Sequence, residues 1–341
     1  MDISVLGIDL AKSVFQLHGS NGRGKAVLTK RLSRAQVLPF LANLSPCLVG
    51  MEACASSHFW AREIRKLGHE VKLMAPQFVR PYVKSNKNDR ADAEAIAEAV
   101  TRGSMRFVPV KSVEQQDVLS LHRVRERLVG SRTALVNELR GLLGEYGIVL
   151  PQGRRQIRAH ASGVIENAST QGLITTLARE TFSELLQELR RLDEQIQRLE
   201  ERILAVHKNH PVCQRLAEIP GVGPLTATAI VMSVGDPKAF KNGRELSAWL
   251  GLVPRQHSSG GKERLLGISK RGDVYLRKLL IHGARTSIRW VDRKPPGRRT
   301  DWLKALIERR GINRATVALA NKNARQMWVL MARGERFNEA A

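Results

Sequence analysis

Two pairs of acidic residues have the spacing of a metal site that handles phosphates. Asp89 and Asp92 lie three residues apart in a stretch expected to be helical, so both project from one face. Asp9 and Glu52 each end a short apolar run that predicts a buried strand, and sites in open α/β sheets form at the carboxyl ends of strands. Four such carboxylates repel one another unless cations intervene, and their oxygens suit Mg²⁺. More than one Mg²⁺ ion could then stabilise both oxygens of a phosphodiester exchange.

Each acid also fits a plainer role on its own. An acid in the first turn of a helix stabilises the helix, because the free backbone N–H groups there attract negative charge. Asn88, just before Asp89, is a good N-cap for such a helix. An acid after a strand often only begins a turn.

The cations Lys84, Lys87 and Arg90 surround the helix start, and we expect them to contact nucleic-acid phosphates.

A second chemical stretch, residues 253–271, reads VPRQHSSGGKERLLGISKR. We expect a flexible cationic loop in which Ser258 or Ser259 is exposed and could attack a phosphodiester. The residues expected to hold its phosphate are Arg255, Lys262, Arg264, Lys270 and Arg271. The plainer interpretation is a flexible loop without chemistry.

The segment 219–231, IPGVGPLTATAIV, resembles the hairpin of a helix-hairpin-helix motif. Its glycines, Gly221 and Gly223, would let backbone N–H groups approach a DNA phosphate, and Pro224 suits the first turn of a helix. A plain turn between helices is the alternative.

Hydrophobic patterns predict the elements that must position these residues. Strands are expected over 3–9, 14–20, 25–33, 47–53 and 70–75, with helices over 33–44, 57–67 and 88–100. This order predicts an α/β domain with a mixed sheet over residues 1–110.

The remaining chain is predicted to be helical. A leucine-rich heptad pattern runs from Leu121 to Tyr146 and a 4-3-4-3 pattern from Leu185 to Val206, which indicates a coiled coil within 111–210. That coiled coil is either a hairpin within one chain or also an arm that pairs protomers. Residues 154–172 are polar and poorly patterned. Residues 211–341 form a third, mostly helical domain with the serine loop and a basic tail.

Charge points to a polyanionic partner. The 341 residues carry a formal charge of +24, and 21 Lys and Arg stand against six Asp and Glu between Arg255 and Arg336. This tract lacks an amphipathic stripe with a Trp/Phe face, so nucleic acid is favoured over a membrane surface. No apolar run reaches the ~18 residues of a membrane span, and three scattered cysteines fit a reducing cytosol.

Taken together, five segments carry a family resemblance. GIDLAK, GMEA, KNDRADAEA, IPGVGPLTATAI and GLVPRQHSSGGKERLLGISKRGD, in this order and spacing, resemble the DEDD transposases of the IS-one-ten insertion-sequence family. The chain is most similar to the IS-eleven-eleven branch, over about residues 3–290.

The resemblance implies a RuvC-like, ribonuclease-H-fold N-terminal domain, a coiled-coil arm and a C-terminal transposase domain. It implies an Mg²⁺-binding tetrad of Asp9, Glu52, Asp89 and Asp92, and a serine nucleophile at Ser259. Family members often have a single serine before the glycine at this position. This chain has two serines there, so Ser258 stays an alternative nucleophile.

The expected function is therefore RNA-guided, Mg²⁺-dependent recombination of an insertion sequence by serine transesterification. The expected partners are donor and target DNA, a structured noncoding bridge RNA, and further copies of the chain in a dimer or tetramer. No membrane partner is expected, and the resemblance implies a location in the bacterial cytosol, associated with the nucleoid. The alternatives are a hydrolytic Holliday-junction-type nuclease that uses the same acids, and a basic scaffold without catalysis.

Overall fold

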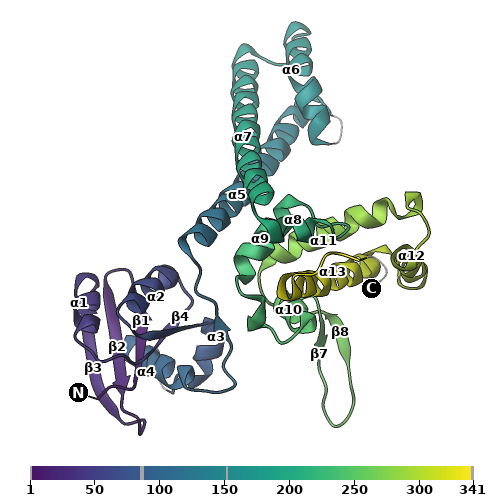
Figure 1. The fold of residues 1–341 in the computed structure, drawn as a ribbon. Helices are drawn as coiled ribbons and strands as arrows, with labels where there is room; N and C mark the ends of the chain where they lie inside the picture. The colour runs from purple at the N-terminus through teal and green to yellow at the C-terminus, as the bar shows by residue number, and fades with distance from the viewer. Residues whose placement is uncertain (1, 85–87, 151–152, 339–341) are drawn as a thin grey trace. The chain divides into compact units, whose positions relative to one another are not determined.

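A mixed six-stranded sheet forms the first of two units into which the chain folds in the computed structural model (Figure 1). The structure describes residues 2–84, 88–150 and 153–338. The first unit comprises residues 1–115 with 234–239, and the second comprises 116–233 with 240–341.

The elements of the first unit follow the predicted order closely. They are β1 (Val5–Leu10), β2 (Val14–Ser20), β3 (Ala26–Ser33), α1 (Val37–Ala42), β4 (Leu48–Glu52), α2 (Ser57–Lys66), β5 (Glu70–Met74), α3 (Pro76–Val79), α4 (Asp89–Val100) and β6 (Phe107–Val108). The sheet order is β3-β2-β1-β4-β5-β6. Strands β1, β4 and β5 are parallel, whereas β2, β3 and β6 are antiparallel to their neighbours. This mixed α/β arrangement fits the ribonuclease-H-like fold that the sequence resemblance implies.

Helices dominate the second unit. They are α5 (Val113–Gly144, which begins in the first unit), α6 (Arg154–Thr170), α7 (Thr176–Asn209), α8 (Pro211–Ala217), α9 (Pro224–Val234), α10 (Gly243–Trp249), α11 (Val274–Arg289), α12 (Arg298–Arg310) and α13 (Ile312–Arg333). Two short strands, β7 (Pro254–Gln256) and β8 (Leu265–Ile268), form an antiparallel pair. None of the helices in the described part of the chain has both the length and the apolarity that a membrane span requires.

Helices α5 and α7 pack side by side within one chain and run antiparallel (Figure 1). Arg125 pairs with Glu200 at 2.6 Å, and one heptad along, Arg132 pairs with Asp193 at 3.0 Å. Helix α6 covers the same apolar cluster through Ile157, although residues 154–172 had no clear helical pattern. The structure therefore pairs these helices within the chain, and pairing between protomers stays a prediction.

Candidate active site

The parallel pairing of β1 with β4 sets the first two acids beside each other. Ile8 is in register with Met51, so the next residues, Asp9 and Glu52, lie at equivalent positions on adjacent strands. Neighbouring strands are about 4.8 Å apart, which is close for two carboxylates. Both residues are partly buried. A shared neighbour supports this convergence, because burial and then the charges of Glu52 and Asp9 raise the pKa of the Cys54 thiol.

Two glycines allow helix α4 to lie directly on these strands. Gly7 and Gly50 are register partners on β1 and β4. A Cβ atom on Gly7 would lie 2.2 Å from the Ala93 carbonyl oxygen, and one on Gly50 would lie 2.8 Å from the Cβ of Val100. Side chains alternate along a strand, so Asp9 and Glu52, two residues further on, project from the face that carries α4.

The second acid pair begins that same helix. Asn88 caps α4 by accepting a hydrogen bond from the Ala91 N–H at 2.8 Å, as the sequence predicted. Asp89 and Asp92 therefore lie in the first turn, and Asp92 directly precedes the Ala93 that touches Gly7. All four acids thus belong to one side of the sheet.

Oxygen-rich carboxylates fit Mg²⁺, and these four are the residues that would hold it. Across residues 2–84, 88–150 and 153–338, however, no three His, Cys, Asp or Glu side chains are close enough to form a metal cluster. The shared Mg²⁺ shell therefore stays a prediction, for which the common face and the strand register are the support.

The cations predicted around α4 have different surroundings. Lys84 forms an ion pair with Glu98 at 2.9 Å, and this hydrogen bond is the main cause of its raised pKa. Arg90 is exposed, and its charge contributes to lowering the pKa of the His18 imidazole, for which burial is the larger cause. Lys87 lies outside the described residues. Lys84 therefore has a carboxylate partner on α4 as well as its predicted role toward phosphate.

The serine stretch is a β-hairpin, so the expectation of a flexible loop was wrong. Ser259 and Lys262 form a bridge, with the Lys262 N–H donating to the Ser259 carbonyl at 3.1 Å. Gly260 and Gly261 between them have φ values of 56° and 76°. A two-residue turn with positive φ at both positions suits the twist of a hairpin, and glycine adopts it without strain.

The hairpin register separates the two serines. The His257 N–H donates to the Arg264 carbonyl at 2.9 Å, which continues the Ser259–Lys262 pairing two residues down the strand. Alternation then gives Ser259, His257, Lys262 and Arg264 one face. Ser258 takes the opposite face, where its hydroxyl accepts a hydrogen bond from Gln256 at 2.9 Å. Ser259 therefore shares its face with two cations and an imidazole, whereas Ser258 is engaged by an amide.

The other predicted cations lie at the base of the hairpin. Arg255 is exposed on β7. Lys270 has a φ of 55°, and its N–H donates to the Gly251 carbonyl at 3.2 Å. The Arg271 carbonyl accepts a hydrogen bond from buried Arg277 at 3.0 Å. The backbone around Lys270 and Arg271 thus anchors the hairpin to the helical unit.

The two glycines of the 219–224 turn serve different purposes. Gly221 has a φ of 90°, and a Cβ there would lie 2.7 Å from the Gly283 carbonyl oxygen on α11, so this glycine permits close helix packing. Gly223 is exposed, and a Cβ there would meet nothing within 4 Å. Gly223 is therefore the better candidate for a backbone contact with phosphate.

Sequence reasoning missed a buried polar link between three helices. His122 on α5 contacts the Tyr275 hydroxyl on α11 through Nδ1 at 2.9 Å and the Thr228 hydroxyl on α9 through Nε2 at 3.0 Å. Thr228 donates its own hydrogen to the Pro224 carbonyl at 2.7 Å, so it accepts from a protonated Nε2. Burial lowers the pKa of His122 to about 4, so the imidazole is neutral near pH 7. The partners lie up to 153 residues apart, and no local pattern signals them.

Known proteins match nearly the whole chain. A DEDD family model described as a transposase matches residues 6–148, and one described as "Transposase IS116/IS110/IS902 family" matches residues 213–300. The chain is 52% identical over 335 residues to a "Probable family 20 transposase" of Pseudomonas aeruginosa, covering 98% of each. It is 52% identical to the "Transposase for insertion sequence element IS1111A" of Coxiella burnetii, covering 98% of this chain and 92% of that one. It is 43% identical to the IS1328 transposase of Yersinia enterocolitica over 99% of both.

Proposed function

Because the chain belongs to the IS116/IS110/IS902 family of DEDD transposases, and so is a DNA strand-transfer enzyme, we propose that it moves an insertion sequence by serine transesterification. The observation that carries this proposal is the serine hairpin. Its turn presents Ser259 on the face that also holds His257, Lys262 and Arg264.

The proposed step exchanges one phosphoester for another. The Ser259 Oγ forms a bond to the scissile phosphorus while the bond to the 3′ oxygen breaks, which leaves a phosphoserine and a free 3′ hydroxyl. His257 accepts the serine proton and releases it to solvent water, and the leaving 3′ oxygen takes up a proton from solvent water, so no net proton is gained or lost. Lys262 and Arg264 offset the charge that develops on the phosphate. The reverse reaction with the exchanged strand rejoins the DNA, so no nucleotide cofactor is required.

The N-terminal acids complete the proposed chemistry. Asp9, Glu52, Asp89 and Asp92 would hold Mg²⁺, which polarises a phosphate when bound. Their arrangement on one side of the sheet supports this assignment. We further propose that a structured RNA encoded by the element pairs with donor and target DNA, and that the protein acts as a homo-oligomer. The charge of +24 supports a nucleic-acid partner of this kind.

The deciding experiment compares Ser259→Ala with Ser258→Ala, assayed for covalent protein–DNA adducts on suicide substrates. Loss of adducts in Ser259→Ala with retention in Ser258→Ala is the expected result. The reverse pattern would move the nucleophile by one residue. Metal-dependent cutting without any adduct would favour a hydrolytic nuclease, and recombination that runs equally well without RNA would reject the guided mechanism.

A further inference from the structure

A group of cations outside the serine hairpin and the acidic site gathers where α12 meets α13. Arg298 and Arg299 begin α12, and Lys322 and Arg325 lie one turn apart on α13. The two helices pack against each other. Arg298 and Arg325 are exposed, Lys322 is half-buried, and Arg299 is 5% exposed.

Buried Arg299 fixes this group in place. Its guanidinium donates to the Gln326 side chain at 2.8 Å and to the Asn323 side-chain oxygen at 2.5 Å. It also donates to the Pro220 carbonyl at 3.4 Å, which Asn323 reaches as well at 3.1 Å. Pro220 directly precedes the 221–224 turn, so the cation group is tied to the turn that exposes Gly223.

Lys322 is placed by an aromatic ring. Its ammonium lies 4.6 Å from the centre of the Trp302 ring on α12, a cation–π contact that orients the side chain. Burial lowers the pKa of Lys322, and the charges of Arg299, Arg298 and Arg325 lower it further. Like charges held this close by packing repel one another, and this repulsion is relieved when an anion binds.

We propose that Lys322, Arg298 and Arg325 form a binding site for the phosphodiester backbone of nucleic acid, which continues the phosphate path from the exposed Gly223. The cations come from two helices and so present several separate positive charges. A strand with successive phosphates can contact all of them, whereas a ligand with a single carboxylate cannot. This inference rests on the proposed function only in taking nucleic acid as the ligand. DNA and RNA share the chemistry, and the experiment separates them.

The first test measures the salt dependence of binding to a 30-base-pair DNA duplex and to a structured RNA of similar length. The double variant Lys322→Gln/Arg325→Gln is compared with Arg309→Gln/Arg310→Gln, which removes the same charge from the exposed end of α12. Each lost phosphate contact should reduce the slope of log K against log salt by about 1. For one contact, this corresponds to roughly eightfold weaker binding at 0.1 M salt if the curves meet near 1 M.

We expect the salt slope to fall in the Lys322→Gln/Arg325→Gln variant and not in the Arg309→Gln/Arg310→Gln variant. The nucleic acid, DNA or RNA, for which this difference is seen is the ligand of the site. Equal losses in the two variants would assign the effect to net charge and overturn the site. A direct measurement is amine labelling read by mass spectrometry, with exposed Lys304 as the reference. DNA or RNA should protect Lys322 from labelling more than Lys304. Protection of Lys322 by polyglutamate but not by DNA or RNA would also overturn the proposal. Neither measurement depends on strand cleavage, so a failure of the serine mechanism would be seen separately.

Discussion

At the scale of single residues, the face shared by Ser259 and His257 makes a proton-transfer role testable. Two residues apart on a strand, their side chains are neighbours on one face. We expect His257→Ala to lower the rate of adduct formation by about 10²–10⁴-fold, the usual contribution of a general base. DNA affinity should stay nearly unchanged. Single-turnover adduct kinetics with His282→Ala, an exposed histidine of α11, as the control would check this. An unchanged rate in His257→Ala would remove the imidazole from the mechanism.

Another histidine makes stability depend on pH. Burial, and secondarily the charge of Arg125, lowers the pKa of His122 from 6.5 to about 4. Between these values the unfolded chain binds a proton that the folded chain does not, so the contribution of His122 is present above pH 6.5 and is lost as pH falls. The free energy of unfolding should drop by about 2 kcal/mol from pH 7.5 to pH 5 on this account.

The check for His122 is denaturant unfolding of the wild type and of His122→Gln at both pH values. The wild type should lose more stability on acidification than the variant does. Parallel losses would show that other groups set the pH dependence.

At the scale of elements, close contact between α4 and the sheet positions two of the four acids. Gly7→Ala would place a methyl group 2.2 Å from the Ala93 carbonyl oxygen, so α4 must shift or the sheet must distort. Overpacking of this kind typically costs about 1–3 kcal/mol. Gly103→Ala, where a Cβ meets nothing within 4 Å, is the matched control. Thermal unfolding should show a lower midpoint for Gly7→Ala alone, and equal midpoints in the two variants would contradict the close packing.

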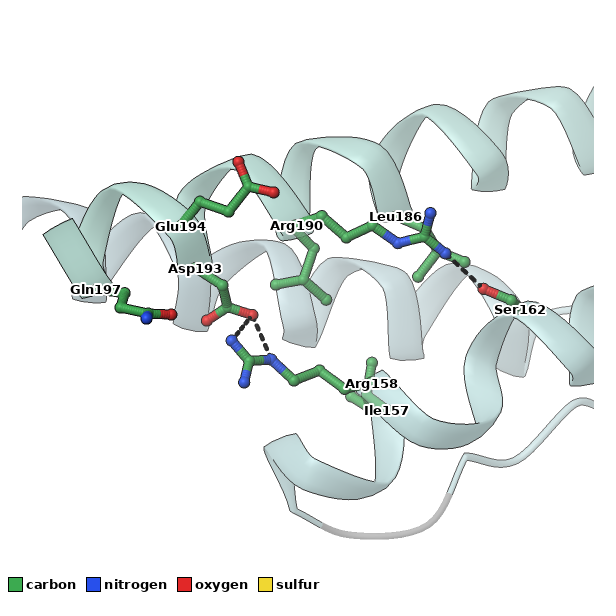
Figure 2. Close-up of a pocket in the computed structure, with 9 residues that line it drawn as sticks. Ile157, Arg158, Ser162, Leu186, Arg190, Asp193, Glu194 and Gln197 are labelled. Atoms are coloured by element: carbon green, nitrogen blue, oxygen red, sulfur yellow. Dashed lines mark hydrogen bonds and ion pairs between the residues drawn. The ribbon is translucent and has the colours of Figure 1, made fainter.

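A buried carboxylate joins the three helices of the α5–α7 region. Asp193 on α7 pairs with Arg132 of α5 at 3.0 Å and with Arg158 of α6, and a pocket of about 270 Å³ opens beside it (Figure 2). Asp193→Ala would leave the Arg132 guanidinium, itself little exposed, without its partner. Breaking a buried pair in this way costs roughly 3–5 kcal/mol.

The control for Asp193 is the adjacent, exposed Glu194→Ala, which should change stability by no more than about 0.5 kcal/mol. Urea unfolding of both variants measures the difference. Similar stability in the two would mean that the Asp193 pairs contribute little.

Sequence periodicity predicted the elements whose apolar residues are contiguous or regularly spaced. The strands β1 and β4 follow short apolar runs, and the ends of those runs located Asp9 and Glu52 before the register was known. Residues 154–172 lacked a clear helical pattern because half of the buried face of α6, Ala161 and Ala168, is alanine, which gives a weak apolar signal. The hairpin was missed because β7 and β8 are short and β7 is exposed and contains the cation Arg255, although the Gly260–Gly261 turn signal was present.

At the scale of the whole molecule, the proposed acids and the proposed nucleophile belong to two separate compact units. Covalent connection of the units does not require that Asp9 and Ser259 of the same copy act together. The arm that α5 and α7 form within one chain is the element that we predict to pair with another copy. We therefore predict that a working site combines the acids of one copy with the serine of another.

Mixing purified Ser259→Ala protein with Asp9→Asn protein tests this sharing. In a randomly mixed dimer, half of the molecules pair one variant with the other, and each such dimer has one site with intact acids and an intact serine. One quarter of all sites are then complete, so adduct formation should return to about one quarter of the wild-type level. The control mixes Ser259→Ala with a protein that carries both substitutions and so lacks any intact serine. Activity in that control would reveal another nucleophile, whereas no restoration in the first mixture would place each site within a single chain.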